Sequence, residues 1–113
     1  MKIWIDDIRP APEGYIWCKS VNEAKEYIEF YEQETLRRVL FHPVVEEFDE
    51  WSVSLIDIDH DAGDYAQYGG DYIKILDWLE ETNRNYPIHI HSMNPVGIEN
   101  MRRIIQRNNW KEV

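Results

Sequence analysis

Acidic side chains follow two short apolar segments that lie far apart in the sequence. Asp6 and Asp7 close the run Lys2–Asp6, and Asp59 and Asp61 follow the run Val53–Ile58. Carboxylates that lie close together repel one another, and their burial is costly unless a cation or protons compensate the charge. Carboxylate oxygens are ligands that suit Mg²⁺ and Mn²⁺, and Mg²⁺ often bridges to phosphate. The set therefore predicts a divalent cation site, although each acid taken singly fits a solvated strand end.

Histidines supply candidate proton donors and acceptors. His91 stands at the tip of the apolar run Pro87–Ser92, and imidazole titrates near neutral pH, so we expect His91 to act as a general acid or base. His60, beside Asp59, is a second candidate, although its side chain is expected to face away from its neighbours. His89 is expected to be a hydrogen-bonded core residue. A Zn²⁺ or Mn²⁺ site on His89 and His91 together with an Asp is the alternative, weakened for zinc by the lack of a thiolate cluster and of a helical His-x-x-x-His pair.

The segment after His91 suits a phosphoryl group. Asn94-Pro95 is a favoured helix start, and the first amides of a helix lack internal partners and attract anions. Ser92, Asn94 and the amides of Val96 and Gly97 are therefore candidate phosphate ligands, with a plain helix cap as the alternative. Arg9 is expected either to clamp a second phosphate or to pair with the acids nearby.

A glycine-bearing loop, Ala62–Gly70, carries two tyrosines. Tyr65 and Tyr68 lie three residues apart in this loop. Their rings could stack on a base or a ribose face. Packing within the loop explains them equally well.

The elements that must position these residues alternate between strand and helix. Ser20-Val21-Asn22-Glu23 has the pattern of a capping box and predicts a helix that buries Val21, Ala24, Ile28 and Tyr31. Asp71–Glu81 and the segment after Asn94 are the other predicted helices. The predicted strands are Lys2–Asp6, Tyr15–Lys19, Val53–Ile58 and Pro87–Ser92, with a stub at Trp110–Val113. This order predicts an α/β fold with a mostly parallel sheet of four to five strands, whose carboxyl ends carry the candidate residues.

Two parts of the chain leave alternatives open. The eight residues Asp7–Gly14 are too few for a helical crossover, so either a bare loop runs back across the sheet or the strands it joins are antiparallel. Within Glu32–Ser52, Leu36–Phe41 has a strand-like composition. The stretch as a whole fits an inserted hairpin, a lid or an oligomer contact.

Composition limits the function classes. The length of 113 residues indicates a single domain, 1–113, and one cysteine, Cys18, excludes an intrachain disulfide and fits a reducing, cytoplasmic location. Twelve basic against 22 acidic residues give a net charge of −10, which opposes binding to duplex DNA but is compatible with a small phosphorylated ligand beside a cation. No apolar run approaches the roughly 20 residues of a membrane helix.

Three motifs together resemble a known family. Trp4-Ile5-Asp6-Asp7-Ile8-Arg9-Pro10-Ala11-Pro12, Asp59-His60-Asp61 and His91-Ser92-Met93-Asn94-Pro95-Val96-Gly97 resemble the cyclic-phosphate-processing receiver-like domain family, which is related to response-regulator receiver domains. The resemblance implies a receiver-like, flavodoxin-like sheet with an acidic metal pocket. It also implies the handling of cyclic phosphates on nucleotides or RNA ends, as in RNA repair.

The resemblance assigns roles to individual residues. Asp6 and Asp7 match the metal-binding acids of receivers, Asp59 matches the acid that receivers phosphorylate, and Ser92 matches their strand-end Ser/Thr. Two features depart from receivers: the first receiver helix is replaced by the loop Asp7–Gly14, and the lysine of the fifth strand has no match, since Lys111 would open a strand that the chain cannot finish. The added His60 and His91 favour acid–base chemistry.

Two main functions follow as expectations. The first is a divalent-metal-dependent phosphoesterase that acts on a cyclic phosphate or on a nucleotide or RNA-end phosphate, with Asp59, His60 and His91 as catalytic residues. The second is a noncatalytic receiver-like module that binds a phosphorylated ligand or is phosphorylated on Asp59. A plain interaction domain that uses Glu32–Ser52 and carries a vestigial pocket is a third.

Overall fold

The computed structural model describes residues 1–41 and 51–113. Its four strands are β1 (Lys2–Ile5), β2 (Tyr15–Cys18), β3 (Leu55–Ile58) and β4 (Ile88–Ile90), and all neighbours in the sheet are parallel. The strand order is β2-β1-β3-β4, which is the order of a flavodoxin-like sheet. The predicted receiver-like α/β fold is confirmed. No helix within the described residues has the length and apolarity needed to cross a membrane.

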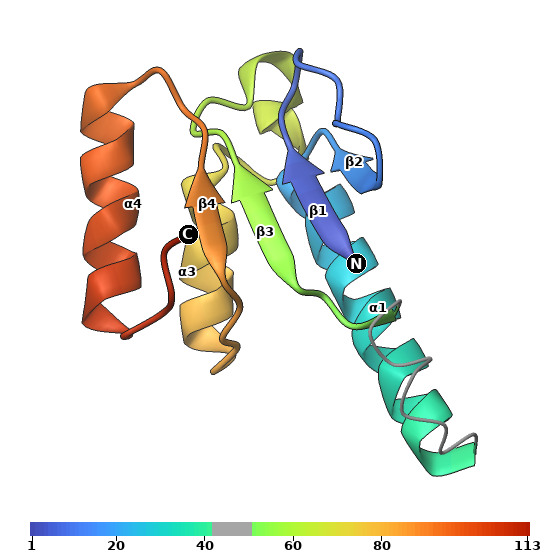
Figure 1. Cartoon of the computed structure of the whole chain (residues 1–113). Helices are drawn as coiled ribbons and strands as arrows, with labels where there is room; N and C mark the ends of the chain where they lie inside the picture. Colours follow the sequence, from blue (N-terminus) through green and yellow to red (C-terminus); the bar gives the residue numbers. More distant parts are fainter. Residues whose placement is uncertain (42–50) are drawn as a thin grey trace.

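Three α-helices and one 3₁₀ helix lie wholly within residues 1–41 and 51–113 and flank the sheet. They are α1 (Val21–Phe41), η2 (Gly63–Tyr68), α3 (Ile73–Glu81) and α4 (Pro95–Arg107). Figure 1 shows α1 and α3 behind the sheet and α4 beyond β4. Successive side chains of a strand point to opposite faces of the sheet, so buried and less buried residues alternate along β1. Ile3, Ile5, Ile56 and Ile58 are buried in the core, whereas Trp4 and Asp57 are register partners on the other face.

Local signals in the sequence set where the helices begin. At α1, the Glu23 amide donates to Ser20 Oγ (3.1 Å) and the Lys19 amide donates to Glu23 Oε1 (2.9 Å), so the predicted capping box forms. The predicted stripe of α1 is buried, namely Val21, Ala24, Ile28 and Tyr31. At α4, Asn94 is the N-cap and Pro95 the first helical residue.

The connection from β1 to β2 is a bare loop that returns across the sheet, and the two strands are parallel. The Asp6 side chain holds this loop, because its Oδ1 accepts hydrogen bonds from the amides of Ile8 and Arg9 (2.9 Å each). Trp4 Nε1 donates to the Arg9 carbonyl oxygen at 2.8 Å. A loop held by these hydrogen bonds thus takes the place of the first receiver helix, as predicted from the sequence.

The strand-like prediction for Leu36–Phe41 is wrong, because α1 continues to Phe41. Its apolar residues are exposed there (Leu36 59%, Phe41 70%), so their run does not mark a buried strand. Polar pairs at helical spacing, such as Arg37 with Glu34 (2.9 Å), support the helix instead. The rest of the predicted hairpin or lid falls largely on residues 42–50, outside the described residues.

The C-terminal segment returns to the sheet edge at β4. A parallel bridge joins Ile88 and Glu112, so the predicted final strand is reduced to one bridge. His89 is exposed on the face away from the core, and its Nδ1 lies 2.7 Å from the Val113 carbonyl oxygen. The prediction of His89 as a core residue is therefore wrong, because the inward positions of β4 are taken by Ile88 and Ile90.

Candidate functional site

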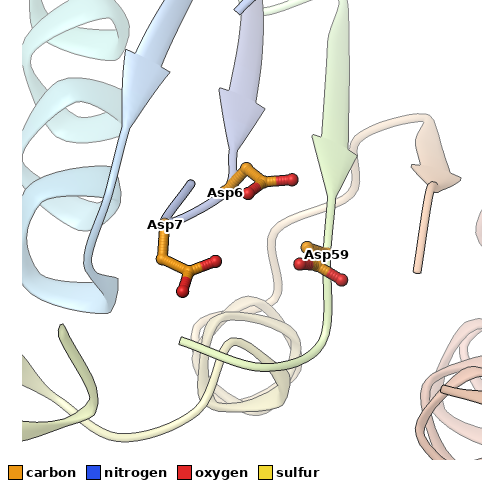
Figure 2. Close-up of side chains that lie close together, drawn as sticks. All are labelled: Asp6, Asp7 and Asp59. Atoms are coloured by element: carbon orange, nitrogen blue, oxygen red, sulfur yellow. The ribbon is translucent and has the colours of Figure 1, made fainter. Parts of the chain in front are cut away.

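The candidate site lies at the switch point of the sheet. The chain leaves β1 toward β2 on one side and reaches β3 on the other, and ligands of such sheets bind beyond the carboxyl ends of the two central strands. Asp6 and Asp7 follow β1, and Asp59 follows β3. One carboxylate oxygen of each lies within 4.8 Å of the others (Figure 2). The predicted convergence of these three acids is confirmed.

The three carboxylates, hereafter the carboxylate cluster, have different electrostatic surroundings. Burial opposes ionisation of Asp6, but hydrogen bonds from the Arg9 and Ile8 amides outweigh it and lower its pKa. At Asp7, burial together with the charges of Asp6 and Asp59 raises the pKa. The negative charge of the cluster is thus least compensated at Asp7.

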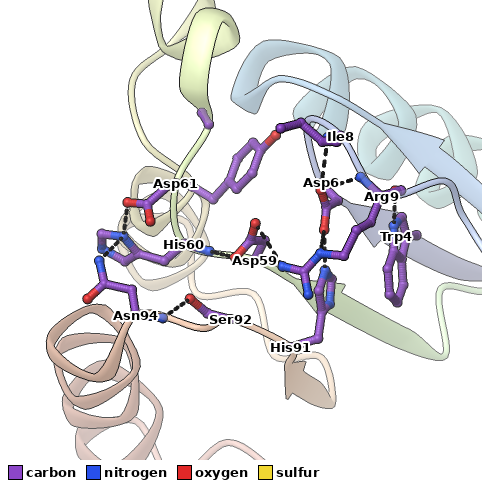
Figure 3. Close-up of polar contacts among 12 residues, drawn as sticks. Trp4, Asp6, Ile8, Arg9, Asp59, His60, Asp61, His91, Ser92 and Asn94 are labelled. Atoms are coloured by element: carbon purple, nitrogen blue, oxygen red, sulfur yellow. Dashed lines mark hydrogen bonds and ion pairs between the residues drawn. The ribbon is translucent and has the colours of Figure 1, made fainter.

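Arg9 supplies a positive charge to the cluster. Its Nε lies 2.9 Å from Asp6 Oδ2 and its Nη2 lies 3.2 Å from Asp59 Oδ2 (Figure 3). Its side chain is 45% exposed, so part of the guanidinium faces solvent. Of the two roles left open by the sequence, the structure shows the pairing with acids.

His91 is fixed between two carboxylates. Its Nδ1 lies 2.5 Å from Asp57 Oδ1, and its Nε2 lies 3.0 Å from Asp6 Oδ2. The ring also stacks on Trp4, with centroids 3.8 Å apart and planes 4° apart. Both ring nitrogens are therefore occupied within the protein, and His91 connects Asp57 to the cluster.

Sequence reasoning missed Asp57 and Trp4. Asp57 stands two residues before Asp59, and Trp4 stands two residues before Asp6, so each shares a strand face with a cluster residue. The β1–β3 register pairs Trp4 with Asp57. This period-two spacing is a signal that would have pointed to both.

His60 and Asp61 do not join the carboxylate cluster. His60 Nδ1 lies 2.8 Å from Asp61 Oδ1 and 3.5 Å from Asn94 Nδ2, and Figure 3 shows the ring directed toward Asn94. The expectation that His60 faces away from Asp59 is confirmed. Asp61, predicted as a fourth metal ligand, has a side chain that is 62% exposed and pairs with His60 instead.

The predicted phosphate ligands of the segment after β4 have three different outcomes. Asn94 is the N-cap of α4, and its Oδ1 accepts from the Gly97 amide at 3.0 Å. This capping bond replaces the phosphate role that was predicted for Asn94 and for the Gly97 amide. Val96 is exposed, and a phosphate role for its amide stays a prediction. Ser92 Oγ accepts from the Asn94 amide at 3.1 Å. Among the described residues the Ser92 hydroxyl has no hydrogen-bond acceptor, so its proton can be donated to a ligand.

The 3₁₀ helix η2 lies directly beside the cluster. Gly63, at its start, has φ of 55°, and a Cβ at this position would lie 2.5 Å from Asp7 Oδ2. Only glycine allows both this backbone conformation and this approach. On the other side, Trp17 Nε1 donates to the Asp6 carbonyl oxygen at 2.7 Å. The end of β2 and η2 therefore both border the cluster.

Fold and site together define a class of protein, a receiver-like α/β domain with an acidic cluster at its switch point. The family model for the cyclic-phosphate processing receiver domain matches residues 1–107, and the chain belongs to this family. The family predicted from the three motifs is thereby confirmed. Neither a search of curated proteins nor a search of solved structures gave a match.

Proposed function

We propose that this chain is a divalent-metal-dependent phosphoesterase-type domain that acts on a cyclic phosphate or on the terminal phosphate of a nucleotide or an RNA. The observation that carries the proposal is the convergence of Asp6, Asp7 and Asp59 at the switch point. The description of its family as cyclic-phosphate processing supports the substrate class.

The donor set fits Mg²⁺ or Mn²⁺. All three ligand groups are carboxylates, and hard cations prefer oxygen ligands. A cation would also compensate Asp7, whose pKa is raised by burial and by the neighbouring negative charges. When bound, such a cation polarises phosphoryl oxygens or activates water. Asp6, Asp7 and Asp59 would hold it.

The neighbouring residues would bind the phosphate and keep the cluster in place. Arg9 has five N–H donors in a planar fork, and those not used by Asp6 and Asp59 can meet phosphate oxygens. The Ser92 hydroxyl would donate a further hydrogen bond. His91 holds Asp6 through Nε2, so we assign it a positioning role: proton transfer to a leaving oxygen would first require this contact to break.

A thermal-shift titration with Mg²⁺, Mn²⁺ and Ca²⁺ tests the metal site. We expect stabilisation of the wild-type chain, since a ligand that binds the folded state raises its stability. Asp7→Asn should abolish the shift. Asp61→Asn is the matched control, because Asp61 is also a strand-end acid but lies outside the cluster, and it should respond as wild type does.

Turnover of 2′,3′-cyclic and 3′,5′-cyclic nucleotides with each cation tests the chemistry. We expect release of a phosphomonoester that depends on the cation and on Asp7. Absence of turnover across the whole panel would contradict the proposal. A mass gain after incubation with acetyl phosphate that is lost in Asp59→Asn would instead indicate the phosphorylated-module alternative.

A further inference from the structure

An aromatic pocket adjoins the carboxylate cluster. It has a volume of about 540 Å³ and lies between the end of β2, the start of α1 and η2. This is within the range of roughly 300–1,000 Å³ that small-molecule sites occupy. The lining residues are Trp17, Lys19, Ser20, Glu23, Tyr65 and Tyr68.

The pocket and the cluster share a wall. Trp17 Nε1 donates to the carbonyl oxygen of Asp6 at 2.7 Å, so the Trp17 indole reaches the backbone of a cluster residue. Across the pocket, η2 begins at Gly63, which lies against the Asp7 carboxylate. Trp17 and η2 thus border both the pocket and the cluster, which places the pocket next to Asp6 and Asp7.

The polar groups of the pocket wall are mostly satisfied within the protein. Ser20 Oγ accepts from the Glu23 amide, and Glu23 Oε1 accepts from the Lys19 amide. Three aromatic rings and one ammonium group remain to meet a ligand. Lys19 Nζ lies 4.5 Å from the Trp17 ring centroid and 5.9 Å from that of Tyr65. Among the described residues, no carboxylate lies within ion-pairing distance of Lys19.

We propose that this pocket binds the nucleobase of the substrate, which makes the substrate a nucleotide or an RNA terminus rather than a base-free phosphate. The placement of the phosphate at the carboxylate cluster rests on the proposed function. Bases stack on aromatic side chains, and every base offers a π-face. The Lys19 ammonium lies 4.5 Å from the centroid of the Trp17 ring, so a base that stacks on this face of Trp17 would have to displace it.

The charge of Lys19 argues against a cationic ligand. Aromatic pockets also hold quaternary ammonium groups through cation–π contacts. Here the protein already places its own ammonium over Trp17 and near Tyr65, so a second cation would meet a like charge. A neutral planar base meets no such repulsion.

A nucleoside titration tests the pocket alone, without metal and without phosphate. Adenosine and cytidine at millimolar concentrations are added to ¹⁵N-labelled protein, and the Trp17 indole N–H signal is assigned by its loss in Trp17→Phe. We expect this signal to shift, and Tyr65→Ala to weaken binding at least about fivefold. Tyr27→Ala, which removes a half-exposed tyrosine of α1 outside the pocket, should bind as wild type does. An indole signal that no nucleoside moves, or equal binding by Tyr65→Ala, overturns the proposal.

A second arm distinguishes this inference from the proposed function. The values of kcat/KM for a nucleoside 2′,3′-cyclic phosphate and for base-free ribose 2,3-cyclic phosphate are compared. We expect wild type and Tyr27→Ala to prefer the nucleoside substrate and Tyr65→Ala to lose at least about fivefold of this preference. Equal kcat/KM for both substrates in wild type overturns the base pocket while the phosphoesterase remains. If neither substrate is turned over, the proposed function fails, and the titration alone decides on the pocket.

Discussion

Asp57 is a buried residue that orients the candidate site through His91. It is 6% exposed, and its carboxylate holds His91, which in turn holds Asp6. Partners that orient a metal ligand typically contribute about 10- to 100-fold to metal affinity or activity. Asp6, one of the three proposed metal ligands, thus depends on a residue that lies outside the carboxylate cluster.

Asp57→Ala should therefore weaken Mn²⁺ binding by about tenfold or more, because His91 and Asp6 lose their fixed orientation. Isothermal titration calorimetry measures the affinity directly. Asp77→Ala is the control. Asp77 is an acid on α3 whose side chain is 38% exposed, and it pairs with Lys74 rather than with a residue of the carboxylate cluster. Equal Mn²⁺ affinity in Asp57→Ala and wild type would show that the His91 contact does not matter for the cluster.

Cys18 gives a second prediction at the residue scale. It is fully buried, and burial, with a smaller contribution from Glu23, raises the pKa of its thiol to about 12. Because the thiolate is the reactive form, native protein should resist labelling by a disulfide reagent at about pH 8. Denatured protein should react with one thiol per chain. Fast labelling of the native protein, measured by absorbance, would show that the end of β2 opens readily.

At the scale of elements, the start of α4 packs closely against the loop after β3. Gly97 lies against His60, and a Cβ built on Gly97 would stand 2.4 Å from His60 Cγ. His60 has little freedom to yield, since its ring contacts Asp61 and Asn94. This contact explains a glycine within a helix, where alanine is ordinarily favoured by about 1 kcal/mol.

Gly97→Ala should destabilise the protein by roughly 1–3 kcal/mol, against the usual preference for alanine in helices, because the added methyl group displaces the His60 ring. Urea unfolding measures the change. In a His60→Ala background the same substitution should be neutral or stabilising. A double-mutant cycle with no coupling between the two positions would contradict the proposed contact.

Local signals explain why the sequence predicted some elements well. The Ser20 capping box and the Asn94-Pro95 start are decided by neighbouring residues, and both helices begin where these signals stand. The composition of Leu36–Phe41 favours a strand because four of its six residues are apolar, but the helix continues through this segment and leaves those four exposed. Whether a residue is exposed depends on which other elements pack against it, and this cannot be predicted from local composition alone.

Some residues of the candidate site could likewise be predicted from the sequence, and others could not. The meeting of Asp6, Asp7 and Asp59 follows from a rule about strand ends, so it was predictable from element order. The place of Asp57 depends on the register between β1 and β3, which pairs it with Trp4. The capping role of Asn94 competed with a phosphate role, and only the hydrogen bond from Gly97 distinguishes them.

At the scale of the whole molecule, contacts between distant segments hold the helical layer to the sheet. Glu32 on α1 accepts hydrogen bonds from Arg84 (2.8–3.1 Å) and from the Tyr86 hydroxyl, and these two residues lie in the segment that leads into β4. Burial opposes ionisation of Glu32, but the hydrogen bonds from Arg84 and Tyr86 outweigh it and lower its pKa. A carboxyl group whose pKa is lowered by folding stabilises the folded state only while it is ionised.

Glu32→Gln should accordingly reduce the free energy of unfolding at neutral pH by roughly 1–2 kcal/mol, since a hydrogen-bonded charge is lost. The stabilisation by Glu32 is fully present above its ordinary pKa of 4.5 and is lost as the pH falls through the lowered value in the folded state. The difference between wild type and Glu32→Gln should therefore shrink below about pH 4.5. Urea unfolding of both proteins over a pH series measures it.

The comparison isolates Glu32 because other acids titrate in both proteins. Asp6, whose pKa is also lowered, contributes equally to wild type and variant, so its effect cancels in the difference. Glu26→Gln, at an exposed position of the same helix, should cost little at any pH and controls for the change in net charge. If the difference for Glu32→Gln stays constant into acid, the ion pair with Arg84 contributes nothing through its charge. The connection between α1 and the segment before β4 would then rest on packing and on hydrogen bonds that do not require the charge.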